Sequence, residues 1–86
     1  GGCLGIDDFE KNNIKIYPNP VHNEFTVAVK ENTNYQLYTI TGVLVKQGNI
    51  NTTTNTIVVN ELSSGCYILK LQAESGKIES VKVVKE

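Results

Sequence analysis

The feature that most constrains the fold of this chain is a period-two alternation of apolar and polar residues, which runs from Ile14 to the C-terminus. Successive side chains of a β-strand point to opposite faces, so this alternation predicts strands with one buried face. Phe25, Val27 and Val29, for example, share one face, and no stretch of ten residues holds the apolar stripe of a helix. The pattern predicts seven strands, at residues 14–17, 24–30, 34–40, 43–50, 56–59, 65–72 and 78–84.

Polar segments with turn chemistry separate these strands. Gly42 supplies a residue that tolerates a positive φ, and the segments 30–34, 51–55, 63–65 and 74–76 are polar connectors. Seven short strands at this spacing favour an all-β fold, an immunoglobulin-like β-sandwich of about seven short antiparallel strands. The Cys…Trp…Cys core of antibody domains is missing, so the prediction concerns the architecture alone.

Two prolines, Pro18 and Pro20, interrupt the alternation near its start, in the sequence IYPNPV. Proline cannot donate a hydrogen bond to a sheet, and it forces the preceding residue into an extended geometry. The first strand should therefore end near Tyr17, and the second should begin near Glu24. The same prolines would protect an edge strand against pairing with another chain.

The chain has 86 residues and a net charge of −1, which corresponds to one small domain. We assign residues 14–86 to this domain and residues 1–13, rich in Gly, Asn and charge, to a flexible linker that proteases can reach. The chain begins with Gly and not with Met or a signal peptide, so we expect it to be part of a longer protein. No apolar run approaches the roughly 20 residues of a membrane helix, and we expect no membrane insertion.

Several classes of function find no support in the residues. All eight basic residues are Lys, and the lack of Arg on a nearly neutral chain argues against nucleic-acid binding. The single histidine, His22, has no partners at metal-ligand spacing, so we expect a surface residue, no metal site and no cofactor. A Ser/His/Asp triad would need Asp7 or Asp8, which lie in the linker, so we expect no catalytic residues and no enzyme activity.

The two cysteines, Cys3 and Cys66, leave the redox compartment open. Cys3 lies in the Gly-rich lead and Cys66 in an apolar run, and nothing in their spacing supports a disulfide between them. We favour two free thiols, with Cys66 as a small hydrophobic residue of a strand, although a disulfide is possible.

Binding modules are the alternative class. A carbohydrate-binding surface would need exposed aromatic side chains, but the chain has no Trp, and its four Tyr residues all fall in strand patterns, where we expect packing roles. An immunoglobulin-like adhesion module of a secreted enzyme, which binds carbohydrate or protein, stays open as an alternative. So does a spacer domain without a ligand.

Four fragments in this order carry a resemblance: IYPNPVHNEFTV, YQLYTITGVLV, TIVVNELSSGCYILKL and SVKVVKE. Together they resemble the type A C-terminal sorting domain of cargo proteins of the type IX secretion system, over residues 14–86. The resemblance implies an immunoglobulin-like domain at the end of a larger secreted protein. The outer-membrane translocon of Gram-negative Bacteroidetes would read it, and a sortase-like peptidase at the cell surface would then remove it from the cargo. Localisation would be periplasmic in transit, then at the cell surface or extracellular.

The resemblance also implies a set of recognition residues. Thr39 departs from the family, many members of which carry an Asp three residues before the turn glycine, and this puts the rigidity of the turn in question. We expect the terminal strand to be captured by strand addition, with Lys82 and Lys85 steering from its rim, and we expect loss of residues 82–86 to abolish export while the sandwich stays mostly folded. Alternatively, this segment is only the last strand of a sheet. The implied residues are Pro18, Asn19, Pro20, Gly42, Leu62, Gly65, Tyr67, Lys82, Val83, Val84 and Lys85.

Overall fold

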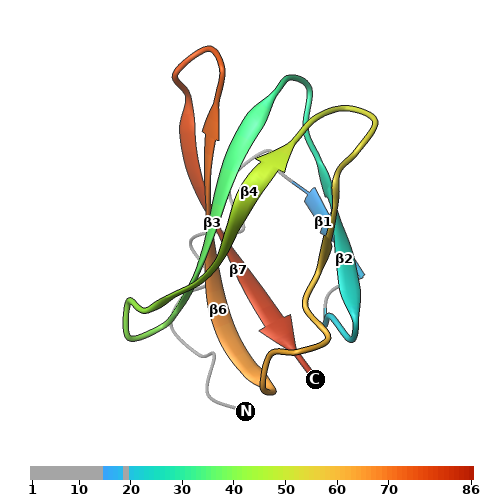
Figure 1. Ribbon diagram of the computed structural model, residues 1–86, viewed down its shortest axis with the longest axis vertical. Helices are drawn as coiled ribbons and strands as arrows, with labels where there is room; N and C mark the ends of the chain where they lie inside the picture. The colour runs from blue at the N-terminus through green and yellow to red at the C-terminus, as the bar shows by residue number, and fades with distance from the viewer. Residues whose placement is uncertain (1–14, 19) are drawn as a thin grey trace.

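A computed structural model describes residues 15–18 and 20–86 (Figure 1). All seven predicted strands are present, with ends shifted by no more than two residues, and the described residues contain no helix that could cross a membrane. Figure 1 labels the seven strands β1 (Lys15–Tyr17), β2 (Glu24–Ala28), β3 (Thr33–Thr39), β4 (Leu44–Ile50), β5 (Thr56–Val58), β6 (Gly65–Ala73) and β7 (Ile78–Lys85).

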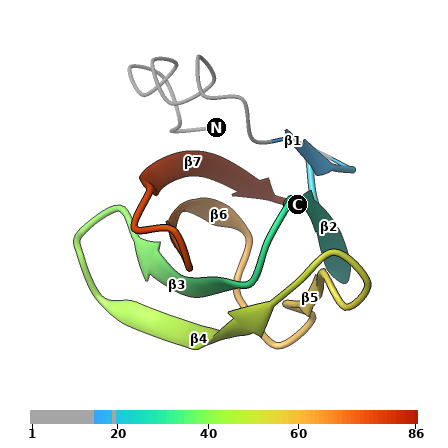
Figure 2. The same ribbon diagram turned by 90° about the horizontal axis from the view of Figure 1, so that it is seen from above.

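The strands form two antiparallel sheets that pack face to face. One sheet has the order β1-β2-β5 and the other the order β4-β3-β6-β7. Seen from above, the larger sheet curves around one side of the core, and the smaller sheet closes the other side (Figure 2). This confirms the predicted all-β, immunoglobulin-like sandwich. The strand that ends at the prolines, β1, lies at an edge of its sheet, as predicted.

The core is built from the inward faces that the alternation predicts. Phe25, Leu37 and Leu69 are fully buried between the two sheets, and Tyr35 packs with them. One of the expected packing roles is wrong, because the side chain of Tyr17 is 54% exposed. A strand as short as β1, at the edge of its sheet, leaves such a ring with little to pack against. The core residues are Val21, Phe25, Val27, Tyr35, Leu37, Ile50, Ile57, Val59, Tyr67, Leu69, Leu71, Val81 and Val83.

Candidate functional site at one end of the sandwich

Segments that lie far apart in the sequence meet at the lower end of the sandwich in Figure 1. The register places Thr39 opposite Tyr67, and Gly65 opposite Lys85, so the turn after β3, the start of β6 and the end of β7 share this end. The segment after the prolines joins them through a parallel bridge between Val21 and Lys85. We call this region the motif end: residues 18–23 without residue 19, 40–43, 59–67 and 82–86.

Val21 fastens the end of β7 to the β1–β2 connection. Its N–H donates a hydrogen bond to the carbonyl of Val84 at 2.7 Å, and its carbonyl accepts one from the N–H of Glu86 at 2.8 Å. The Val21 side chain is fully buried. Pro18 and Pro20 are exposed beside it, and Asn19 lies outside the described residues. The Pro-x-Pro segment is therefore followed directly by two backbone hydrogen bonds that hold the C-terminal strand. We call this pair of bonds the Val21 clamp.

The Leu…Gly-x-Tyr motif forms the corner that leads into β6. The hydroxyl of Tyr67 donates to the carbonyl of Ser63 at 2.7 Å, and its ring is buried in the core. Leu62 packs against the same core, and Gly65 makes the bend with a φ of +151°. A tyrosine at the start of this strand that bonds to backbone upstream is the tyrosine corner of immunoglobulin-like sandwiches. The motif thus fixes the corner that pairs with the end of β7.

The turn between β3 and β4 is closed by several hydrogen bonds. Gly42 has a φ of +94°, and its N–H donates to the carbonyl of Thr39 at 2.9 Å. The Thr39 hydroxyl accepts from the N–H of Val43 at 3.1 Å and shares a hydrogen bond with the Thr41 hydroxyl at 2.8 Å. Thr39 therefore caps this turn through its hydroxyl, at the position where the resemblance leads us to expect an aspartate.

The terminal basic segment is more deeply embedded than the sequence predicts. Val83 is 1% exposed and belongs to the core, and Lys82 is only 8% exposed, so the expected position of Lys82 on an open rim is wrong. Val84 and Lys85 are half-buried. The structure brings all of the described motif residues to one end, but the recognition role of each one stays a prediction.

Glu61 adds a local charge cluster to the motif end. Its own backbone N–H, a hydrogen bond from Lys46 at 3.3 Å and the nearby charge of Lys85 hold the pKa of the Glu61 carboxyl below its ordinary value. The carboxylate is therefore charged at neutral pH, and its pairing with Lys46 is lost only when the pH falls through the lowered pKa. This exposed pair joins β4 to the segment that carries Leu62.

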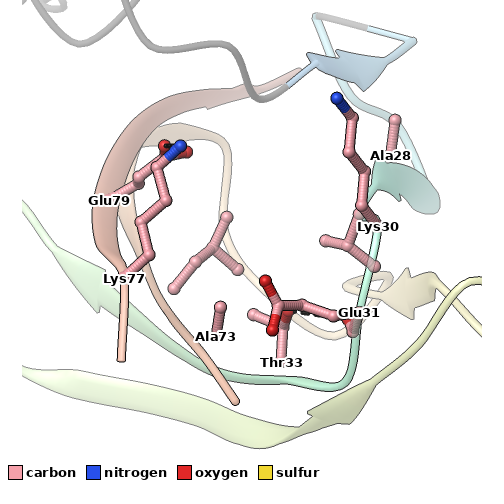
Figure 3. Close-up of a pocket in the computed structure, with 9 residues that line it drawn as sticks. Ala28, Lys30, Glu31, Thr33, Ala73, Lys77 and Glu79 are labelled. Carbon is pink, nitrogen blue, oxygen red and sulfur yellow. Dashed lines mark hydrogen bonds and ion pairs between the residues drawn. The ribbon is translucent and has the colours of Figure 1, made fainter. Parts of the chain in front are cut away.

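The opposite end of the sandwich holds a cavity of about 130 Å³ (Figure 3). Val29 and Leu71 contribute apolar walls, while Lys77 and Glu79 lie side by side on one wall. The Nζ of Lys77 is 3.1 Å from Oε1 of Glu79, but Oε2 of Glu79 is buried and receives no hydrogen bond from the described residues. No histidine or cysteine lines the cavity, and the hydroxyl of Thr33, which does line it, donates to the backbone carbonyl of Glu31 at 2.9 Å and not to a side-chain base.

We expect the substitution Glu79→Leu to stabilise the domain by about 1 kcal/mol, because it removes a buried oxygen without a partner and adds apolar contact with Leu71. The midpoint of urea unfolding measures this change. Glu79→Gln is the matched control, since it keeps a polar group in the same place and should give no gain. A Leu variant that is less stable than the wild type would mean that the carboxylate is satisfied in solution.

The other sequence-predicted groups show no assembled reactive site. Cys66 is half-buried on β6 and disulfide-bonded, so the expectation of a free thiol there is wrong; its partner lies outside the described residues. Spacing in the sequence could not settle this pairing, because it depends on the distance between the two residues in the fold. His22 is exposed, and Asp7 and Asp8 lie outside the described residues. Among residues 15–18 and 20–86, no three His, Cys, Asp or Glu side chains gather as a metal site.

The fold and the site therefore define a small immunoglobulin-like module whose motifs gather at one end. A family model, the secretion system C-terminal sorting domain, matches residues 15–86, and the chain belongs to this family. The family is a sorting signal of type IX secretion, not a catalytic domain, and marks a protein for export to the cell surface or the extracellular space. No match was found among curated proteins or solved structures.

Proposed function

We propose that this domain carries a cargo protein, attached at its N-terminus, through the outer-membrane type IX translocon, and that a sortase-like surface peptidase then removes it. The observation that best supports the proposal is the meeting of the Pro-x-Pro, Leu…Gly-x-Tyr and terminal segments at the motif end. A translocon that contacts this end would read three motifs at once, although the first lies more than forty residues before the second in the sequence.

The disulfide at Cys66 is consistent with this route. Disulfides form and persist in oxidising compartments such as the periplasm, and they are rare in the cytosol. A cargo domain in transit through the periplasm would meet those conditions. We place the surface cleavage in or upstream of the proposed linker, residues 1–13, because a cut there would release the cargo and leave the strands of the sandwich uncut. Those residues lie outside the described part of the chain.

The test is a fusion of the whole 86-residue chain to the C-terminus of a periplasm-directed reporter, expressed in a host that has the type IX system. We expect the reporter at the cell surface or in the medium, without the domain, and we expect a translocon-deficient host to retain the intact fusion in the periplasm. A reporter without the domain is the matched control. Periplasmic retention of both reporters in the competent host would reject the sorting function.

An adhesion module would need a surface that binds carbohydrate or protein. A shallow polar depression crosses β3, β4 and β6 on the outer face of the larger sheet. Its amides could bond to sugar hydroxyls, but Tyr35, the one aromatic residue in it, is buried and offers no ring face for stacking. Binding of the whole chain on a glycan array would favour this alternative. The lining residues are Asn34, Tyr35, Gln36, Gln47, Gly48, Asn49, Lys70 and Gln72.

A further inference from the structure

Three large aliphatic side chains are exposed at the turn between β3 and β4. Ile40 is 58% exposed, Val43 57% and Leu44 42%, and they lie within five residues of one another around Gly42. Single exposed apolar residues are common on soluble proteins and need no explanation. A group of three on one protruding turn is more often a contact surface than such isolated residues are. We call Ile40, Val43 and Leu44 the apolar tip.

The outer face of the larger sheet continues the apolar tip toward β6. Leu44 lies opposite Tyr38 in the register, and Tyr38 lies opposite Ile68, so these three side chains share one face. The next outward row toward the other end is polar, with Gln36 between Gln47 and Lys70. Along β4, β3 and β6, the outer face is therefore apolar in the row beside the tip and polar in the next row.

The apolar tip is held in one conformation before any partner arrives. The N–H of Thr39 donates a hydrogen bond to the carbonyl of Val43 at 2.8 Å, and the N–H of Val43 donates a second one to the Thr39 hydroxyl at 3.1 Å. A preformed turn loses little conformational entropy on binding, which favours affinity from a small area.

Size and charge decide between possible occupants. A stable dimer buries about 800 Å² on each partner, and three partly exposed aliphatic side chains supply much less. Attraction to an anionic bilayer needs basic flanks, but residues 38–45 contain no Lys, and the adjacent Lys46 is paired with Glu61. A small, rigid, uncharged projection instead fits an apolar cleft on a protein, as an anchor surrounded by other contacts.

Building on the proposed sorting function, we propose that the apolar tip is the anchor by which this domain docks into an apolar cleft on a protein component of the export machinery. Ile40 and Val43 are part of the motif end, and Leu44 directly follows it, so one partner could contact the tip and the motifs together. Contacts of the motifs would then orient the domain on the partner protein, and burial of the tip's apolar side chains would contribute to the binding free energy.

The test compares two reporter fusions with the wild-type fusion in the type IX host. The variant Ile40→Gln/Val43→Gln removes the tip's apolar surface, and Ile78→Gln is the matched control, because Ile78 is equally exposed, at 56%, but lies at the opposite end. We expect the export rate of the tip variant to fall about tenfold or more and that of the control to change less than about twofold. Urea unfolding of the isolated chains checks that both variants keep the wild-type midpoint.

The outcomes separate this inference from the proposed function. If the wild-type fusion is exported and the tip variant is exported equally well, the tip has no role and the sorting function stands. If the wild-type fusion is itself retained, the sorting function fails. Two measurements on the isolated chain would also overturn the inference: a dimer in sedimentation that the tip variant loses, or tip-dependent binding to phosphatidylcholine–phosphatidylglycerol vesicles.

Discussion

Deletion of residues 82–86 is expected to unfold the domain, with loss of the cooperative urea transition and of the strand signal in far-ultraviolet circular dichroism. The deletion removes Val83 from the core and takes away the β7 partners of β6 from Gly65 to Ile68. It also removes both backbone partners of Val21. A domain of this size has a stability of only about 5 kcal/mol, and the loss of several core and backbone contacts at once exceeds that margin.

This result would change how an export assay of the truncated chain is interpreted. The sequence suggests a separable tail, whose loss would leave the sandwich mostly folded, and the structure argues against that view. Failure of the truncated fusion to reach the surface would then report unfolding as well as lost recognition. Side-chain substitutions keep the main chain and its hydrogen bonds in place. They therefore test the role of the terminal segment in recognition better than the deletion does.

The matched control is Lys85→Gln, which keeps every backbone hydrogen bond of β7 and changes only a half-buried side chain. We expect its unfolding free energy to stay within about 0.5 kcal/mol of the wild-type value. A truncated chain that unfolds cooperatively near the wild-type midpoint would show that the Val21 clamp and Val83 contribute little, and the separable-tail view would then stand.

The strands could be predicted because each one combines two signals that agree. In the segment that forms β6, Tyr67, Leu69 and Leu71 alternate with more polar residues, and a Ser-Ser-Gly connector precedes it. Both signals are local, so the pattern requires no knowledge of the rest of the chain. The core faces of β2 and β5 were predictable for the same reason, whereas the segment of β3 has apolar residues on both sides, Tyr35 and Leu37 on one and Tyr38 and Ile40 on the other.

Other features depend on contacts between distant segments, and no local pattern contains them. Val21 lies between a proline and the only histidine, outside any alternation, yet the end of β7 buries it completely. Lys82 alternates with valines as an exposed residue would, but it is buried. The prolines before Val21 were the one available signal, since they predict a fixed entry into the next segment without indicating what it contacts.

The motif tyrosine should be the most sensitive single position of the site. Tyr67→Ala is expected to cost about 3–5 kcal/mol, because it empties a large volume in the core next to Val83, its cross-strand partner. Tyr67→Phe keeps the ring but removes the hydrogen bond to Ser63, and should cost about 1–2 kcal/mol. With a margin of about 5 kcal/mol, the Ala variant would be largely unfolded at 37 °C.

Tyr38→Phe is the matched control for the hydroxyl, because the Tyr38 hydroxyl donates to Oε1 of Gln36 at 3.1 Å on the solvent-facing side of the sheet. Water can replace that bond, so we expect a change of less than about 0.5 kcal/mol. Comparing the urea unfolding of the two Phe variants gives the stability that the Tyr67 hydroxyl contributes through its hydrogen bond. Export of the folded Tyr67→Phe fusion tests whether that hydroxyl is also needed for recognition. Equal stability of the two Phe variants would mean that the tyrosine corner does not hold the start of β6. Normal stability with failed export would instead assign the Tyr67 hydroxyl to recognition.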